Sequence, residues 1–324
     1  MRLFALKASE ELGASIAGAL DCALDPHEER DFEDGEHKAR PLVSVRGEDV
    51  YVVHSLNGTP AASANDKLCK LLFFIAACKE NGAASVTAIA PYLAYARKDR
   101  QTKARDPVTT KYVAQLFEAA GADCVMVLQA HNLAAFQNAY RCRTLHLDTR
   151  KLFTPIIKEL VAGQPVAVVS PDGGGMKRAQ LLKETYEAET GESAGFGFME
   201  KRRSRGVVSG TLFAGEVKDA SVFIFDDMIG SGGTMVRAAR ACREHGASRV
   251  YALAAHGLFG EGSEDLFASD AIDGVLVTDS VRTAVEAKVR TEKLRIVPVG
   301  PLIANAIRCL RGNGSLSDLL GMED

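Results

Sequence analysis

The chain has no strong charge of either sign, no paired-cysteine motif and no long hydrophobic run. Its 324 residues include 39 Lys and Arg against 42 Asp and Glu, a net charge of −3, so nothing indicates a nucleic acid or a membrane surface as a partner. The seven cysteines are scattered without a C-x-x-C pair, which favours a reduced cytoplasmic protein over a disulfide framework or a zinc site. No uncharged apolar run approaches the roughly 18 residues that a membrane helix needs.

Two further absences concern targeting and nucleotide binding. The first residues, MRLFALKASEELGASIAGAL, carry Lys7, Glu10 and Glu11 inside any apolar core, so we expect no signal peptide. No Gly-Lys pair occurs in the chain, which excludes a Walker A loop, and a bound nucleotide would need other groups. We therefore expect a cytoplasmic globular protein.

Short runs rich in β-branched residues recur along the chain. Most lack period-2 alternation, which is typical of strands buried on both faces of a sheet. Helical spacing of apolar residues lies between many of them, over 65–81, 110–120, 176–188 and 234–244. The alternation predicts an α/β fold with parallel sheets. The runs are VYVVHS (from Val50), SVTAIAPYL (Ser85), CVMVLQAH (Cys124), VAVVSPDGGG (Val166), SVFIFDD (Ser221), RVYALAAHG (Arg249) and GVLVTDS (Gly274).

One sequence pattern occurs twice. CKENGAASV (78–86) and CREHGASRV (242–250) share a helix end, a Gly-Ala stop and the entry to a strand, and EAAGADCV, from Glu118, is a weaker copy. Glycine caps at helix ends are common enough to explain this without duplication. The other interpretation is two related α/β halves, joined somewhere within 147–163.

Two adjacent carboxylates follow an apolar run in VFIFDDMIGSGGT (222–234). A Gly/Ser/Thr turn at a helix N-terminus offers backbone N–H groups to a phosphate. Asp226 and Asp227 cannot bind that phosphate, so they would face vicinal hydroxyls or a divalent cation, and phosphate plus diol indicates a sugar phosphate. The alternative is a helix cap with solvated acids.

Three other polar segments follow or accompany predicted strands. PYLAYARKDRQTKARDP (91–107) contains seven Arg, Lys or Asp residues and is either a polyphosphate clamp or a solvated loop. In SPDGGGMKRA (170–179), Asp172 suits either a Mg²⁺-bound water or a turn cap. MEKRRSRG (199–206) places four cations in five residues, either as solvated surface or as a loop that neutralises a transferring phosphoryl group.

Together these segments resemble the ribose-phosphate pyrophosphokinases, also called phosphoribosyl pyrophosphate synthetases. The similarity extends to RDFEDGE (30–36), SVRGEDVYVV (44–53) and VGPLIANAI (299–307), in the family's order and nearly end to end. The resemblance implies two similar phosphoribosyltransferase-like domains, each a mainly parallel sheet flanked by helices. We expect an N-terminal domain over 1–148, with 303–324 packing back on it, and a C-terminal domain over 149–302.

The resemblance also implies a reaction: ATP and ribose 5-phosphate give 5-phosphoribosyl 1-pyrophosphate and AMP, with Mg²⁺, for nucleotide biosynthesis. It assigns catalysis to Lys201 and Arg203. For ribose 5-phosphate it implies Asp226, Asp227, Gly230, Ser231, Gly232, Gly233 and Thr234. For ATP it implies Arg97, Lys98, Asp99 and Arg100, together with Phe32, Asp34 and Glu36.

Two features of the family bear on assembly and regulation. Phe32, Asp34 and Glu36 match a loop that holds adenine from a neighbouring subunit, so we expect a homo-oligomer, a dimer or a hexamer. The family reads phosphate or ADP at an allosteric site, to which Ser44, Arg46, Ser315 and Ser317 correspond.

The chain departs from the family's pattern in three places. The metal–ATP histidine position is occupied by Gln129, and His131 lies two residues later, so the metal residues are expected to be Asp172 with either His131 or Gln129. Gly230 stands where many synthetases carry Asp, and Lys98 stands where the family typically has Gln.

Two other functions compete with synthesis. A non-catalytic or weakly active regulatory subunit is favoured by Gln129 and Gly230, whereas retention of Lys201 and Arg203 argues against it. A salvage phosphoribosyltransferase would share the acidic pair but does not predict the 97–103 clamp. Release of AMP separates these functions.

Overall fold

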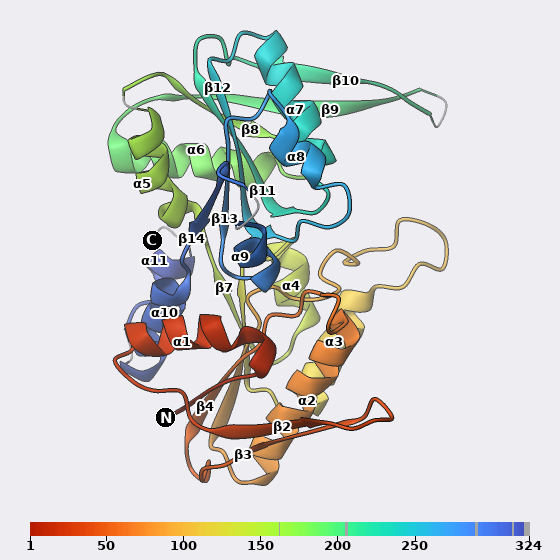
Figure 1. Cartoon of the computed structure of the whole chain (residues 1–324), viewed down its shortest axis with the longest axis vertical. Helices are drawn as coiled ribbons and strands as arrows, with labels where there is room; N and C mark the ends of the chain where they lie inside the picture. Colours follow the sequence, from red (N-terminus) through yellow and green to blue (C-terminus); the bar gives the residue numbers. More distant parts are fainter. Residues whose placement is uncertain (162, 205–206, 289–290, 313, 321–324) are drawn as a thin grey trace. The chain divides into compact units, whose positions relative to one another are not determined.

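The computed structural model describes residues 1–161, 163–204, 207–288, 291–312 and 314–320, and only the backbone at 201–204, 207–211, 285, 288, 318 and 320. The chain forms two compact units. The first comprises Met1–Asp148, Ser280–Arg282 and Pro298–Asp324, and the second comprises Thr149–Asp279 and Thr283–Val297. The C-terminal part of the first unit thus begins at Pro298, and a short piece of the chain, Ser280–Arg282, also belongs to this unit. The sequence predicted a start at residue 303. Each unit is an α/β body, as predicted (Figure 1).

The first unit is built on a parallel five-stranded sheet of order β1-β4-β5-β6-β7. Its strands are β1 (Arg2–Ala5), β4 (Asp49–Val53), β5 (Ser85–Ile89), β6 (Cys124–Leu128) and β7 (Arg143–Leu147). Every residue of β6 is buried, because the sheet is covered on both faces, and this explains the apolar runs without alternation. The core between sheet and helices includes Phe74 and Phe117, both fully buried.

The helices of the first unit come from both ends of the chain. They are α1 (Glu10–Ala19), α2 (Ala64–Glu80), α3 (Thr109–Ala119), α4 (Leu133–Ala139), α10 (Gly300–Gly312) and α11 (Ser317–Leu320), with a 3₁₀ turn over Lys7–Ser9. Helices α1 and α10 lie side by side (Figure 1). A Cβ on Gly300 would collide with Ser15 Oγ, so glycine permits this approach. The Asp148 N–H donates to the Leu319 carbonyl at 3.2 Å, which attaches α11.

A separate antiparallel hairpin lies on α2 (Figure 1). It consists of β2 (His27–Asp31) and β3 (His37–Pro41). Lys70 of α2 pairs with Asp31 at 2.5 Å, and the ring of His37 stacks on Phe73 with centroids 5.3 Å apart. These contacts fix a hairpin whose sequence is too polar to predict a strand.

The second unit is built on a seven-stranded sheet of order β10-β9-β8-β11-β12-β13-β14. Its strands are β8 (Val166–Ser170), β9 (Ala194–Ser204), β10 (Val207–Gly215), β11 (Ser221–Ile229), β12 (Arg249–Gly257), β13 (Gly274–Thr278) and β14 (Leu294–Val297). Among these, β9 and β10 pair antiparallel and the other neighbours are parallel. The helices are α5 (Arg150–Val161), α6 (Met176–Thr190), α7 (Gly233–Glu244), α8 (Glu264–Ala268) and α9 (Arg282–Lys288).

The basic segment at 199–204, interpreted as a loop, is part of β9. It pairs with β10 in a long hairpin that extends past the neighbouring strands (Figure 1). Close approach of the two strands depends on glycine, because a Cβ on Gly195 would lie 2.6 Å from the Glu216 carbonyl and one on Gly197 2.9 Å from the Phe213 ring. A run of cations carries no apolar periodicity, so the pairing was not visible in the sequence.

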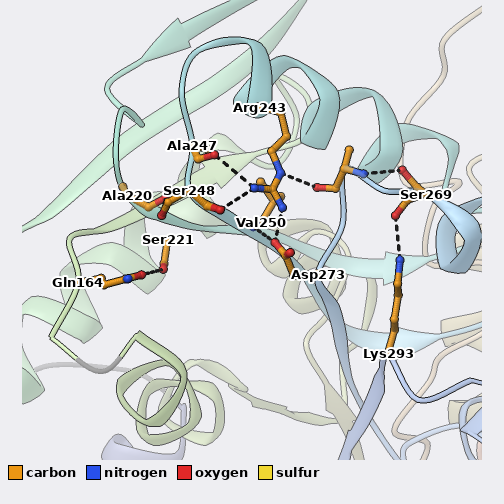
Figure 2. Close-up of polar contacts among 11 residues, drawn as sticks. Gln164, Ala220, Ser221, Arg243, Ala247, Ser248, Val250, Ser269, Asp273 and Lys293 are labelled. Atoms are coloured by element: carbon orange, nitrogen blue, oxygen red, sulfur yellow. Dashed lines mark hydrogen bonds and ion pairs between the residues drawn. The ribbon is translucent and has the colours of Figure 1, made fainter.

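The repeated sequence pattern forms the same structure in both units. Gly82 follows α2 with φ +88°, and Gly246 follows α7 with φ +87°. In the second unit, Asp273 Oδ2 accepts from the Val250 N–H at 2.6 Å and pairs with Arg243 at 2.5 Å (Figure 2).

The first unit repeats this arrangement at the matching positions. Asp123 Oδ2 accepts from the Val86 N–H at 2.7 Å and from Lys79 Nζ at 3.0 Å. A glycine cap at a helix end does not by itself predict the second contact, in which an aspartate just before one strand accepts from a backbone N–H of the neighbouring strand. The matched contacts favour two related halves.

Loss of this carboxylate is expected to destabilise the second unit. Asp273→Ala removes the acceptor of the Val250 N–H and the partner of Arg243, so we expect about 1–2 kcal/mol lower free energy of unfolding. Denaturant unfolding of the variant measures this. Asp270→Ala, at a nearby exposed carboxylate, is the matched control and should change it by less than about 0.5 kcal/mol. Equal effects of the two variants would contradict the prediction.

Candidate functional site

The acidic pair of β11, a half-buried Asp226 and a buried Asp227, shares an arginine. Arg178, from the first turn of α6, places Nη1 2.5 Å from Asp226 Oδ1 and 3.2 Å from Asp227 Oδ1. The side chains of Asp226, Asp227 and Arg178 are 21%, 3% and 12% exposed. The Asp227 N–H also donates to Asp226 Oδ1 at 2.9 Å. Two like charges can therefore lie side by side because one guanidinium contacts both.

Burial and mutual repulsion make the ionisation of this pair incomplete. Burial and the neighbouring Asp227 carboxylate together raise the pKa of Asp226, the Arg178 guanidinium opposes them, and the net result is a pKa of about 7. Asp226 therefore holds a proton more tightly than an ordinary aspartate does. A ligand that needs two ionised carboxylates, such as a cation, must displace this proton.

Sequence reasoning missed Arg178. It is part of the quoted segment SPDGGGMKRA, but only the pairing of β8 with β11 brings the start of α6 beside Asp226. One signal could have indicated it: Arg178 is a basic residue in the first turn of the helix that follows β8, and β8 belongs to the same sheet as the acidic pair.

A glycine-rich turn connects the acidic pair to α7. Gly232 has φ +79°, and a Cβ there would lie 2.8 Å from Leu266 Cβ, so only glycine fits. Residues Gly230, Ser231 and Gly232 lead into α7, whose first residues are Gly233 and Thr234. No side chain of the described residues caps the N-terminus of α7, so its first N–H groups can bind an anion.

Gly230 differs from Gly232 in its surroundings. In the described part of the chain no atom comes within 4 Å of a Cβ placed on Gly230. A side chain would fit here, so the departure from Asp is not a packing requirement.

The loop that follows β12 supports the entry to this turn. The Ile229 carbonyl accepts from the N–H groups of Leu258 at 2.9 Å and Phe259 at 3.3 Å, and the Gly230 carbonyl accepts from the Gly260 N–H at 3.3 Å. Phe259 has φ +43°, which is uncommon for a bulky residue. Nothing in the local sequence indicates this support.

Asp172 lies at the end of β8, the neighbour of β11. Its Oδ1 accepts from the N–H groups of Gly174 at 2.9 Å and Gly175 at 3.2 Å, so it caps the turn before α6. The turn cap uses only Oδ1. Oδ2 can still bind a Mg²⁺-bound water, so the cap does not exclude the metal role predicted from the sequence. No cluster of three or more His, Cys, Asp or Glu suited to a metal occurs among the described residues.

The basic segment of the first unit follows β5. Arg97, Lys98 and Arg100 are exposed and Asp99 is half-buried. Lys98 Nζ lies 3.6 Å from Asp106 Oδ2, and Asp106 also accepts from the backbone of Thr102 and Lys103. The loop is therefore ordered by a carboxylate, while its cations face outwards.

The segment after β6 contains the two candidates for the histidine role. Gln129 is 7% exposed with φ +43°, and its N–H donates to the Leu147 carbonyl at 2.8 Å. His131 is half-buried. Asn132 Nδ2 donates to Asp99 Oδ2 at 2.7 Å, which brings this segment together with the basic one.

Phe32, Asp34 and Glu36 lie at the turn between β2 and β3. All three side chains are exposed, Phe32 by 40%. The guanidinium of Arg30 lies 5.0 Å from the Phe32 ring centroid. The turn thus presents an aromatic face and two carboxylates outwards.

The remaining predicted residues are less fully defined. Lys201 and Arg203 lie in β9 opposite Thr211 and Val208, but their side chains are outside the described part. Ser315 Oγ donates to Ser317 Oγ at 3.3 Å. Ser44, Arg46, Ser315 and Ser317 all belong to the first unit, and within its described residues no hydrogen bond joins the two pairs.

Comparison with known proteins places these features in a family. Residues 1–121 match the N-terminal domain of ribose phosphate pyrophosphokinase, and residues 209–321 match the phosphoribosyl synthetase-associated domain. Ribose-phosphate pyrophosphokinases of Hyphomonas neptunium and Maricaulis maris are 34% and 36% identical, each over 98% of this chain and 99% of the relative. The crystal structure of phosphoribosylpyrophosphate synthetase from Mycobacterium smegmatis has a TM-score of 0.85 and 32% identity, over 97% of this chain and 99% of that chain. No described helix is long and apolar enough to span a membrane.

Proposed function

The chain belongs to the ribose-phosphate pyrophosphokinase family, and we propose that it transfers the diphosphate of ATP to the anomeric hydroxyl of ribose 5-phosphate. The products are 5-phosphoribosyl 1-pyrophosphate, for nucleotide biosynthesis, and AMP. The observation that carries this is the buried Asp226–Asp227 pair beside an uncapped helix N-terminus, in a chain that matches such enzymes end to end.

The second unit holds ribose 5-phosphate. The N–H groups of Ser231 to Thr234 bind the 5-phosphate at the start of α7, where the helix dipole favours an anion. Asp226 and Asp227 accept from the vicinal hydroxyls, with Arg178 limiting their repulsion. Gly230 adds no side-chain ligand.

The first unit holds the nucleotide. Arg97, Lys98 and Arg100 neutralise the triphosphate, and Asp99 orders their segment. We assign the metal–ATP role to His131 rather than Gln129, because Gln129 is 7% exposed whereas His131 is half-buried.

Mg²⁺ fits the groups present. Magnesium is usually held by one or two carboxylates together with substrate phosphates and water, and the carboxylate oxygens present here are of that ligand type. In the second unit Asp172 and the acidic pair would hold it, and in the first unit His131 is the separate candidate beside the nucleotide. When bound, the ion would offset phosphate charge.

Catalysis is positioning and charge stabilisation. The attacking hydroxyl and the leaving AMP lie in line on the β-phosphorus, and negative charge develops on the phosphoryl oxygens. Lys201 and Arg203 of β9 stabilise that charge.

Adenine recognition supports a homo-oligomer, a dimer or a hexamer. Phe32 can stack on a base, and Asp34 and Glu36 can accept from an exocyclic amine. Because these groups are exposed at a hairpin turn, a nucleotide held by a neighbouring subunit can reach them. Ser44, Arg46, Ser315 and Ser317 form the proposed phosphate or ADP site, and the seven free thiols agree with a cytoplasmic location.

The test is release of AMP from ATP, Mg²⁺ and ribose 5-phosphate, with Lys201→Ala as control. Release that depends on ribose 5-phosphate and is lost in the control supports synthesis. Release no greater than that of the control would favour the non-catalytic regulatory subunit, which Gln129 and Gly230 suggest.

The assignment of His131 makes a separate prediction. His131→Ala is expected to raise KM for Mg–ATP about tenfold, a loss of about 1.4 kcal/mol. Gln129→Gly removes the other side chain while suiting φ +43°, and should leave KM within about twofold. Steady-state kinetics with varied ATP measure both, and the opposite order would assign the role to Gln129.

A further inference from the structure

Asn132 uses both ends of its side-chain amide. Its Oδ1 accepts from the Ala135 N–H at 3.2 Å, which caps α4. Its Nδ2 donates to Asp99 Oδ2 at 2.7 Å. One side chain therefore joins the loop after β6 to the loop after β5, and these two strands are neighbours in the sheet.

The bond reaches the centre of the basic segment. Asp99 lies between Lys98 and Arg100, whose side chains are exposed. The backbone at Lys98 is held by its N–H to Tyr95 and its carbonyl to Thr110, at 3.1 and 3.2 Å. The hydrogen bond from Asn132 adds an attachment at the next residue, through the carboxylate.

Long cationic side chains on an unattached loop lose much conformational freedom when they bind a polyphosphate. Fixing the loop beforehand lowers that cost and improves affinity without a new ligand contact. Asn132 can do this without touching the nucleotide.

We propose that Asn132 is a positioning residue for the ATP-binding segment, holding Asp99 so that Arg97 and Arg100 are set for the triphosphate. The inference rests on the proposed function, which it deepens. The amide is suited to both tasks because it accepts and donates at once.

The two tasks of Asn132 can be separated by substitution. Asp and Ser cap helices about as well as Asn, so both variants retain α4. Neither can donate an amide N–H to Asp99. Asp also adds a negative charge, whereas Ser does not, so agreement between the two variants excludes simple repulsion of ATP.

The experiment measures binding of Mg–ATP by calorimetry and, in parallel, the KM values for ATP and ribose 5-phosphate. We expect Asn132→Ser to weaken ATP binding about fivefold and Asn132→Asp at least tenfold. KM for ribose 5-phosphate and the melting temperature should stay at the wild-type values. The proposal is overturned if Asn132→Ser binds ATP as the wild type does, or if both KM values and the melting temperature change together.

This design keeps the two claims apart. A wild-type protein that binds ATP but releases no AMP contradicts the proposed function, and the ATP affinities of the variants still decide the role of Asn132. A wild-type protein that does not bind Mg–ATP contradicts both.

Discussion

Replacing Arg178 by Met is expected to lower kcat/KM for ribose 5-phosphate at least a hundredfold. Arg178 contacts both carboxylates of a buried pair, and removing one partner from such an arrangement leaves uncompensated charge, at a cost of about 3–5 kcal/mol. The pair avoids this cost by keeping a proton, and a protonated Asp226 no longer serves a diol or a cation. A hundredfold loss corresponds to about 2.7 kcal/mol.

Two variants on the same helix control this measurement. Arg178→Lys keeps the charge but loses the planar guanidinium that contacts both carboxylates. Its kcat/KM should therefore lie between those of the wild type and Arg178→Met. Lys177→Met removes an exposed cation one residue away and should leave the kinetics near the wild type. If Lys177→Met and Arg178→Met behaved alike, the local charge of α6 would matter and the contact with the pair would not.

Arg178 also determines how stability depends on pH. The folded-state pKa of Asp226, about 7, lies above that of an unfolded chain, so the folded protein binds this proton more tightly. The contribution of Asp226 to the free energy of unfolding therefore falls as pH rises from about 4 to about 7. Without Arg178 the pKa rises further and the decline extends above pH 7.

The deficit of Arg178→Met relative to wild type should thus grow between about pH 6 and about pH 8. Denaturant unfolding without Mg²⁺ across this range measures it. A deficit that is constant over the range would show that Asp226 does not titrate there.

Much of the fold could be predicted because parallel strands are buried on both faces and therefore form continuous apolar runs in the sequence. The seven apolar runs named from the sequence are all strands, and the helical patterns at 65–81, 110–120, 176–188 and 234–244 correspond to α2, α3, α6 and α7. The strands that were missed are short (β1, β7 and β14), polar (β2 and β3), or the glycine-containing pair β9 and β10, the first of which ends in a run of cations. HEERD and HKARP form β2 and β3 because α2 supports them, and that is tertiary information.

The candidate site divides in the same way. Asp226 lies near the carboxyl end of strand β11, and Gly232 and Arg97 lie in loops that follow strands, so their position at the carboxyl edge was predictable. Arg178, Asn132 and Phe259 act through contacts with other segments, and nothing in their local sequence indicates those partners. Within the phosphate turn, the close approach to Leu266 requires glycine at Gly232, whereas Gly230 has room for a side chain.

The contact through Gly260 leads to the second large effect. Gly260→Pro removes the N–H that donates to the Gly230 carbonyl, and a proline at 260 disfavours the conformation of Phe259, φ +43°. The carbonyls of Ile229 and Gly230 lose their fixed direction, so the N–H groups that follow no longer point together at the 5-phosphate. We expect KM for ribose 5-phosphate to rise about thirtyfold, a loss of about 2 kcal/mol, with KM for ATP unchanged.

Gly260→Ala is the matched control, because in the described chain no atom lies within 4 Å of a Cβ at this position and the N–H is kept. Its KM for ribose 5-phosphate should stay within about twofold of the wild type. Steady-state kinetics with each substrate varied in turn distinguish a specific effect from general damage, which would raise both KM values. If proline and alanine gave the same kinetics, the hydrogen bond to Gly230 would not orient the phosphate loop, and the direction of the α7 N–H groups would have to come from the packing of Gly232 on Leu266 alone.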